Sequence, residues 1–213
     1  MGQYLRARVA GYFRPRRWLF VVVGLVYGIG LILGALGVGF LNSQQIDYLN
    51  QLINSFLAQL QNLEVEDTAY TKEVLSTIWR DLSLIYFLSL SVIGLPGVAV
   101  IIFLRGFLLG FVLGFFIQAM ALDGLVFASL ATLPQNLITI PVYLAAGVTG
   151  VELSWFILRR LSHYPRPALR PYILRITVFM LFLGAVASVG GLIEVYITPL
   201  FMKWVAVALQ AGS

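Results

Sequence analysis

The stretch GVAVIIFLRGFLLGFVLGFFIQAMA, residues 97–121, indicates the class of this protein, because it is long enough to cross a bilayer and contains a single charge, Arg105. A transmembrane helix needs about 20 predominantly apolar residues. A charge inside such a helix is costly, so it is usually paired or functional. The stretch therefore predicts a membrane-spanning helix with one buried arginine.

The composition of the whole chain points the same way. Of its 213 residues 60% are hydrophobic and 11% are charged, whereas soluble domains contain roughly 25% charged residues. The mean hydropathy is +0.93. The chain has no cysteine, which excludes disulfides, thiolate metal sites and a cysteine nucleophile. We expect one membrane domain over residues 1–213.

Five segments of the chain are long and apolar enough to cross the bilayer. We therefore predict an all-α, polytopic helical membrane protein with five transmembrane helices. The expected spans are residues 18–41, 74–93, 97–121, 137–158 and 171–197.

The distribution of charge predicts the orientation of these helices. Arginines cluster before the first span and in the loop 159–170, and such clusters face the cytoplasm. The segment 42–73 is acidic, and Asp81, which follows it, adds to its negative charge. The segment should therefore lie on the external side of the membrane. Five spans then place the amino terminus in the cytoplasm and the carboxy terminus outside.

Helix breakers interrupt the apolar pattern twice. The sequence Gly-Leu-Pro-Gly at residues 94–97 predicts a tight inner turn. A short apolar stretch that begins at Asp123 ends at Pro134, Gln135 and Asn136, and it is too short to cross the bilayer. We predict a re-entrant half-helix with a break at these last three residues, tolerated where protein covers its backbone.

The external segment contains an amphipathic pattern. Leu49, Ile53, Phe56 and Leu60 fall at helical spacing and form one apolar stripe, opposite neutral amide side chains. The stripe has three interpretations: a cap packed over the spans, a docking face for a partner protein, or a lipid contact.

Gly106, Gly110 and Gly114 repeat at four-residue spacing in the third span. Small residues at this spacing let helix backbones approach closely in lipid. Packing within the chain and contact between copies in a homo-oligomer are both open interpretations.

Two charges lie at nearly the same predicted depth. Arg105 is about eight residues from the inner end of the third span, and Glu152 is about six residues from the inner end of the fourth. A pair would relieve the cost of two lone charges. A substrate or ion site, and snorkelling to lipid headgroups, are the alternatives.

The sequence shows no catalytic constellation. Its one histidine, His163, lies in the basic inner loop, so no serine–histidine or metalloprotease pattern is present. We expect a protein without enzymatic activity, catalytic residues, metal or cofactor, whose partners include the lipid bilayer and no nucleic acid.

The segment from Leu133 to Pro141, preceded by the glycine-rich run from Arg105 to Gly114, resembles the family of integral membrane proteins named after stage II sporulation protein M. The resemblance covers essentially the whole chain. The wider family commonly has His, Gly and Glu where this chain has Gln135, Asn136 and Thr139, so a role for a His and Glu pair does not carry over.

The resemblance implies a scaffold in the mother-cell membrane at the sporulation septum. Such a scaffold would recruit and position the peptidoglycan hydrolases stage II sporulation D and P during engulfment. The alternative function, from a different class, is a small transporter or channel that uses Arg105 and Glu152 as a midplane site.

Overall fold

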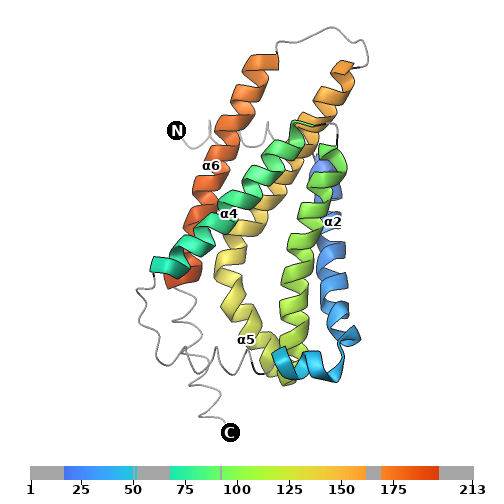
Figure 1. Ribbon diagram of the computed structural model, residues 1–213, viewed down its shortest axis with the longest axis vertical. Coiled ribbons are helices and arrows are strands. Elements are labelled where there is room, and N and C mark those ends of the chain that lie inside the picture. Colours follow the sequence, from blue (N-terminus) through green and yellow to red (C-terminus); the bar gives the residue numbers. More distant parts are fainter. Residues whose placement is uncertain (1–16, 50, 52–67, 92, 162–168, 197–213) are drawn as a thin grey trace.

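The computed structural model describes residues 17–49, 51, 68–91, 93–161 and 169–196, and the regular elements in these ranges are all helical. The fold class is therefore all-α, as predicted. In order along the chain (Figure 1), the elements are α2 (Arg17–Gly37), η2 (Val38–Phe40), α4 (Thr68–Ser89), α5 (Gly94–Leu161) and α6 (Leu169–Tyr196).

Within the described residues, four helical stretches are long and apolar enough to cross a membrane, which makes this a multi-pass membrane protein. They are Arg17–Phe40, Gly94–Ala119, Pro134–Arg159 and Arg170–Tyr196. Their outward side chains are largely apolar, as a surface in contact with lipid requires. Examples with exposed fractions above one half are Val21, Leu25, Ile32, Leu108, Val178 and Phe182.

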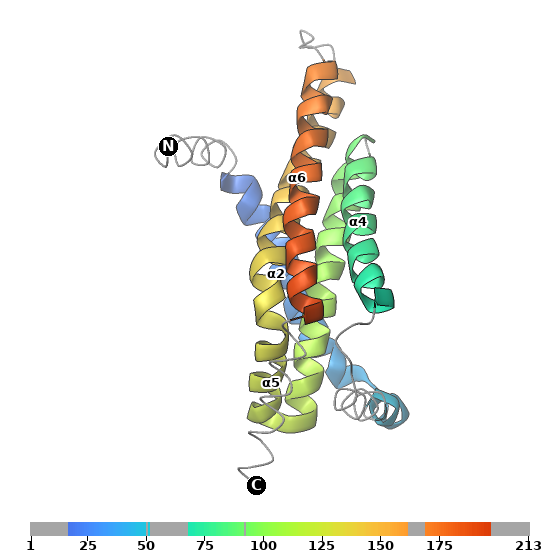
Figure 2. The ribbon, with the colours of Figure 1, turned by 90° about the vertical axis from the view of Figure 1, so that its left-hand side faces the viewer.

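Helix α5 is continuous over 68 residues, and it is bent back on itself so that its two ends lie on the same side of the bundle (Figure 1). Its two halves, the first arm (residues 94–119) and the second arm (134–159), lie side by side in both views (Figures 1 and 2). They are antiparallel, because Gly150 lies against Val98 and Gly147 lies against Ile102. The reversal therefore falls between the arms.

The predicted break at Pro134, Gln135 and Asn136 is wrong, because the helix continues through these residues. A proline removes one backbone hydrogen bond and bends a helix, and membrane helices tolerate that loss where neighbours satisfy the freed groups. α5 contains both Pro134 and Pro141. A re-entrant position for the residues between the arms stays a prediction.

The turn between α4 and α5 precedes the predicted one. Residues 94–97 were expected to form the turn, yet α5 begins at Gly94 and Pro96 occupies its first helical turn, where a proline costs no hydrogen bond. Gly94 lies so close to Leu88 that an added Cβ would be 2.8 Å from the carbonyl carbon of that residue. The sequence Gly-Leu-Pro-Gly therefore starts a helix rather than forming the turn itself.

Helix α4 has the length of a span but not its composition. Its 22 residues reach about 33 Å at a rise of ~1.5 Å per residue, and they include Lys72, Glu73, Arg80 and Asp81, so α4 is not among the four apolar stretches. It nevertheless runs antiparallel along α6, with Trp79 against Gly184. The five-span count therefore stays a prediction.

Glycines bring α2 and the first arm of α5 into direct backbone contact. The two helices are parallel: Gly106 lies against Tyr27, Gly110 against Leu31 and Gly114 against Ala35. A Cβ at Gly114 would be 2.7 Å from the Ala35 carbonyl oxygen. The glycine run predicted for helix packing is thus used within the chain, and this face of α5 is already covered.

We predict that Gly34→Ala destabilises the bundle and that Gly28→Ala does not. A Cβ at Gly34 would lie 2.8 Å from the carbonyl carbon of Phe107, whereas nothing lies within 4 Å of one at Gly28. Both changes add the same methyl group to α2, so the difference isolates the steric cost, about 1 to 3 kcal/mol for overpacking. Thermal unfolding in detergent measures it, and equal midpoints for the two variants would contradict the packing.

We predict that cysteine labelling in intact cells follows a five-span map. A membrane-impermeant reagent should label Asn62→Cys and Gly212→Cys, and it should leave Arg166→Cys unlabelled, because arginine clusters face the cytoplasm. The parallel packing of α2 and the first arm of α5 is consistent with this map, because the chain must cross back between two parallel spans. Labelling of Arg166→Cys, or protection of Gly212→Cys, would contradict the five-span count.

Candidate functional site

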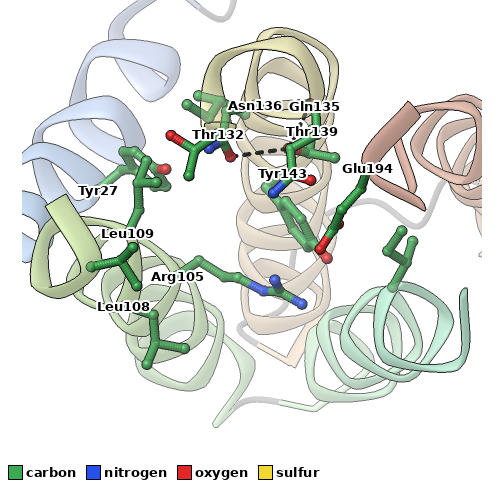
Figure 3. A pocket seen from close by; sticks show the side chains of 13 residues that line it. Tyr27, Arg105, Leu108, Leu109, Thr132, Gln135, Asn136, Thr139, Tyr143 and Glu194 are labelled. Carbon is green, nitrogen blue, oxygen red and sulfur yellow. Dashed lines mark hydrogen bonds between the residues drawn. The ribbon is translucent and has the colours of Figure 1, made fainter. Parts of the chain in front are cut away.

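A polar cavity of about 220 Å³ lies within the helical bundle and touches α2, α4, both parts of α5 and α6 (Figure 3). Its polar lining side chains are Tyr27, Arg105, Thr132, Gln135, Asn136, Thr139, Tyr143 and Glu194. Polar groups are expensive in the hydrocarbon region and usually mark function there. This cavity, which we call the central cavity, is the candidate functional site.

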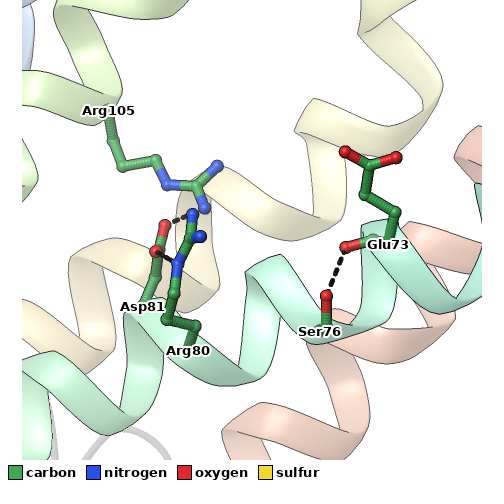
Figure 4. Close-up of polar contacts among 5 residues, drawn as sticks. All are labelled: Glu73, Ser76, Arg80, Asp81 and Arg105. Atoms are coloured by element: carbon green, nitrogen blue, oxygen red, sulfur yellow. Dashed lines mark hydrogen bonds and ion pairs between the residues drawn. The ribbon is translucent and has the colours of Figure 1, made fainter.

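Arg105 enters the central cavity from the first arm of α5 and forms an ion pair with Asp81 of α4 (Figure 4). The Arg105 Nη2 group donates to Asp81 Oδ2. Arg80 also approaches the carboxylate, with its Nε 3.6 Å from Asp81 Oδ1. The side chains of Arg105 and Asp81 are 27% and 15% exposed, so the pair is largely buried and neutralises the arginine.

The predicted pair of Arg105 and Glu152 is therefore wrong. The prediction assumed that both arms of α5 begin and end at the same depth. The observed register places Gly150 against Val98, so Glu152 lies near the start of the first arm while Arg105 lies near its middle. The second arm therefore extends past the start of the first by about five residues, or about 7 Å at ~1.5 Å per residue.

A signal for the observed partner was present in the sequence. Asp81 and Arg105 lie 13 and 11 residues from Gly94, on either side of the turn. In an antiparallel helical hairpin, residues equidistant from the turn face each other at one depth. Grouping Asp81 with the external charges conflicts with its position inside the span predicted at 74–93.

Two buried polar atoms of the cavity have no hydrogen-bond partner among the described side chains and backbone: Gln135 Oε1 and the Tyr143 hydroxyl. Tyr143 is only 4% exposed. Its ring packs under the guanidinium of Arg105, whose Cζ lies 4.5 Å from the ring centroid. A buried polar group without a partner is unfavourable, so both atoms are available to a ligand.

Glu194 lines the central cavity from the last turn of α6. The Tyr70 hydroxyl donates to its Oε1 at 3.4 Å. Burial, and after it the Glu194 carboxylate, raises the pKa of Tyr70 to about 12, so this hydroxyl remains a donor at neutral pH. The position of Glu194 in this cavity is not apparent from the sequence.

Glu152 lines a different cavity, of about 700 Å³, that is mostly apolar. Trp18, Trp155 and Arg159 also line it, and the Arg159 guanidinium carbon lies 5.2 Å from the Trp155 ring centroid. Arg105 and Glu152 therefore belong to separate cavities, which excludes a single site built from both.

The remaining predicted site lies mostly outside the described residues. Of the apolar stripe, Leu49 is half-buried in the helical stretch 43–49 that follows η2, while Ile53, Phe56 and Leu60 fall in the segment that is not described. The basic loop is likewise described only at its two ends. Among the described residues, no group of three His, Cys, Asp or Glu side chains is placed to hold a metal ion.

Comparison with known proteins gives one result. A family model described as "Stage II sporulation protein M" matches residues 21–199, a range that begins just after the first turn of α2 and extends past the end of α6. No curated protein matches the chain. No solved structure matches it either.

We predict that Arg105 is energetically coupled to Asp81 and not to Glu152. Asp81→Asn leaves the guanidinium largely buried without its counter-charge. Breaking a fully buried pair costs about 3 to 5 kcal/mol, and less is expected here because neither side chain is fully buried. A double-mutant cycle with Arg105→Gln, read from unfolding midpoints in detergent, should show coupling for Asp81→Asn. The same cycle with Glu152→Gln is the control, and stronger coupling there would contradict the assignment.

Proposed function

The chain belongs to the family of stage II sporulation protein M, and from this premise we propose that it is a membrane scaffold for sporulation. The scaffold recruits the peptidoglycan hydrolases stage II sporulation D and P and positions them at the septal membrane of the mother cell during engulfment. The family match over residues 21–199 is the observation that carries the proposal.

The helical bundle suits a rigid platform. α2 and the first arm of α5 are held in backbone contact by glycines from both helices, and α4 is tied to α6 by the 2.7 Å hydrogen bond between the Tyr86 hydroxyl and Thr177 Oγ1. Such contacts resist bending in lipid. A segment attached to this platform is held at a defined height above the membrane.

The segment between η2 and α4 is the proposed docking element. It leaves the bundle at the end where α6 finishes (Figure 1), and the charge pattern predicts that this end is external. Peptidoglycan lies on that side, so wall hydrolases would meet the stripe of Leu49, Ile53, Phe56 and Leu60. In this proposal the hydrolytic chemistry belongs to the partners.

Transport is the second candidate, and the central cavity favours it. Arg105 lies near the middle of the first arm, and Glu194 faces the same cavity from α6. Transporters commonly bind substrates near the bilayer midplane between helices. Flux of a solute into vesicles that contain only this purified protein would support transport over the scaffold.

We predict that replacing both Ile53 and Phe56 with Asp abolishes co-purification of the two hydrolases from sporulating cells. A charge placed on a docking face must lose its hydration on binding, which the membrane helices do not experience. Asn54→Asp with Gln61→Asp is the matched control, because it adds the same charge to the opposite face of the predicted helix.

The control variant should retain the hydrolases at the level of the parent. Both variants should accumulate in the membrane with the unfolding midpoint of the parent, since the changed residues belong to the proposed docking segment and not to the membrane helices. Full retention of the hydrolases by the Ile53 and Phe56 variant would exclude the stripe as the docking face.

A further inference from the structure

Among the residues that the structure describes, no cation neutralises one carboxylate of the central cavity, that of Glu194. Of the two charged side chains that line it, Arg105 is paired with Asp81. Within the described helices, Glu194 has no salt bridge, and its hydrogen-bond donor is the neutral hydroxyl of Tyr70 at 3.4 Å. A carboxylate in a low-dielectric site favours a bound cation.

Acceptor atoms accompany this carboxylate on the same side of the cavity. Gln135 Oε1 and the Tyr143 hydroxyl are buried and have no hydrogen-bond partner in the part of the chain that the structure describes, and Tyr143 is more than nine-tenths buried. In Figure 3, Tyr143 and Glu194 point toward each other below Gln135. Carboxylate, amide and phenol oxygens are together a set that accepts hydrogen bonds from an ammonium group.

The opposite wall of the cavity is apolar. Leu108 and Leu109 line it from the first arm of α5, with Tyr27 of α2 beside them (Figure 3). The cavity volume is about 220 Å³, whereas one water molecule occupies about 30 Å³ of liquid. A single dehydrated metal ion would therefore leave most of the cavity empty. The cavity therefore matches a small molecule with one charged end and one apolar end.

We infer that the central cavity binds a small organic cation, with its primary ammonium group among Glu194, Gln135 and Tyr143 and its apolar part against Leu108 and Leu109. This site does not depend on the docking of hydrolases. The ammonium group has two possible sources: a soluble amine, or the headgroup of an aminophospholipid that enters between the helices.

The test uses the full-length protein in detergent with n-butylamine, which is protonated at neutral pH. A ligand that binds the folded state raises the unfolding midpoint in a saturable manner. n-Butylamine should produce this rise, while 1-butanol, its neutral isostere, and sodium chloride at the same ionic strength should not. An equal rise with 1-butanol would overturn recognition of the ammonium group, and an equal rise with sodium chloride would make this an inorganic cation site.

Two variants and one control locate the effect. Glu194→Gln keeps the shape and removes the charge, so the concentration of n-butylamine for a half-maximal rise should increase at least about tenfold. Tyr143→Phe removes one hydroxyl and should weaken binding a few-fold, and it carries the test if Glu194→Gln fails to accumulate. Glu152→Gln, in the other cavity, should bind as the parent does, and equal weakening in all three variants would overturn the site.

Nanodiscs distinguish the two sources of the ammonium group. If the source is a lipid, phosphatidylethanolamine added to phosphatidylglycerol discs should raise the midpoint without n-butylamine, and Glu194→Gln should abolish the rise. If the source is a soluble amine, n-butylamine should raise the midpoint in both kinds of disc and the lipid should have no effect. Failure of both additives would overturn the proposal, and the scaffold function would be unaffected.

Discussion

The ion pair between Arg105 and Asp81 is the interaction on which the arrangement of the helices depends. A guanidinium near the middle of a membrane helix is too costly to leave alone, and the apolar side chains on either side of it in the first arm of α5 offer no compensation. Asp81 supplies the counter-charge from α4. The pair thereby explains why α4, the least apolar of the long helices, packs against α5 within the bundle.

The same pair separates two regions of the bundle. With Arg105 neutralised, Glu194 is left as the dominant charge of the central cavity, and Tyr143 lies between the two. Glu152 lies in the second arm of α5, level with the beginning of the first arm. It belongs to the large apolar cavity with Trp18 and Trp155. The polar cavity and the apolar cavity therefore differ in chemistry and lie at different depths, as a consequence of the stagger between the two arms of α5.

Glycine controls how closely the helices approach one another. In lipid there is no hydrophobic driving force between helices, so association depends on close van der Waals contact and on polar links. Gly34 and Gly110 allow close van der Waals contact between α2 and α5. The hydrogen bond that Ser154 Oγ donates to the Ser91 carbonyl, at 3.0 Å, is one of the polar links. The rigid platform of the proposed scaffold and the walls of the cavity result from the same contacts.

The sequence by itself determined the all-α class, the membrane location and the approximate helix positions, because apolar runs of about 20 residues have few alternatives in a bilayer. It also indicated Arg105 and the glycine run as sites under constraint. Only the tertiary structure decided the partner of Arg105, the position of Glu194 in the cavity and the continuity of α5 through Pro134. These depend on the stagger and rotation of one helix against another, which side-chain packing sets and which the length of an apolar run does not encode.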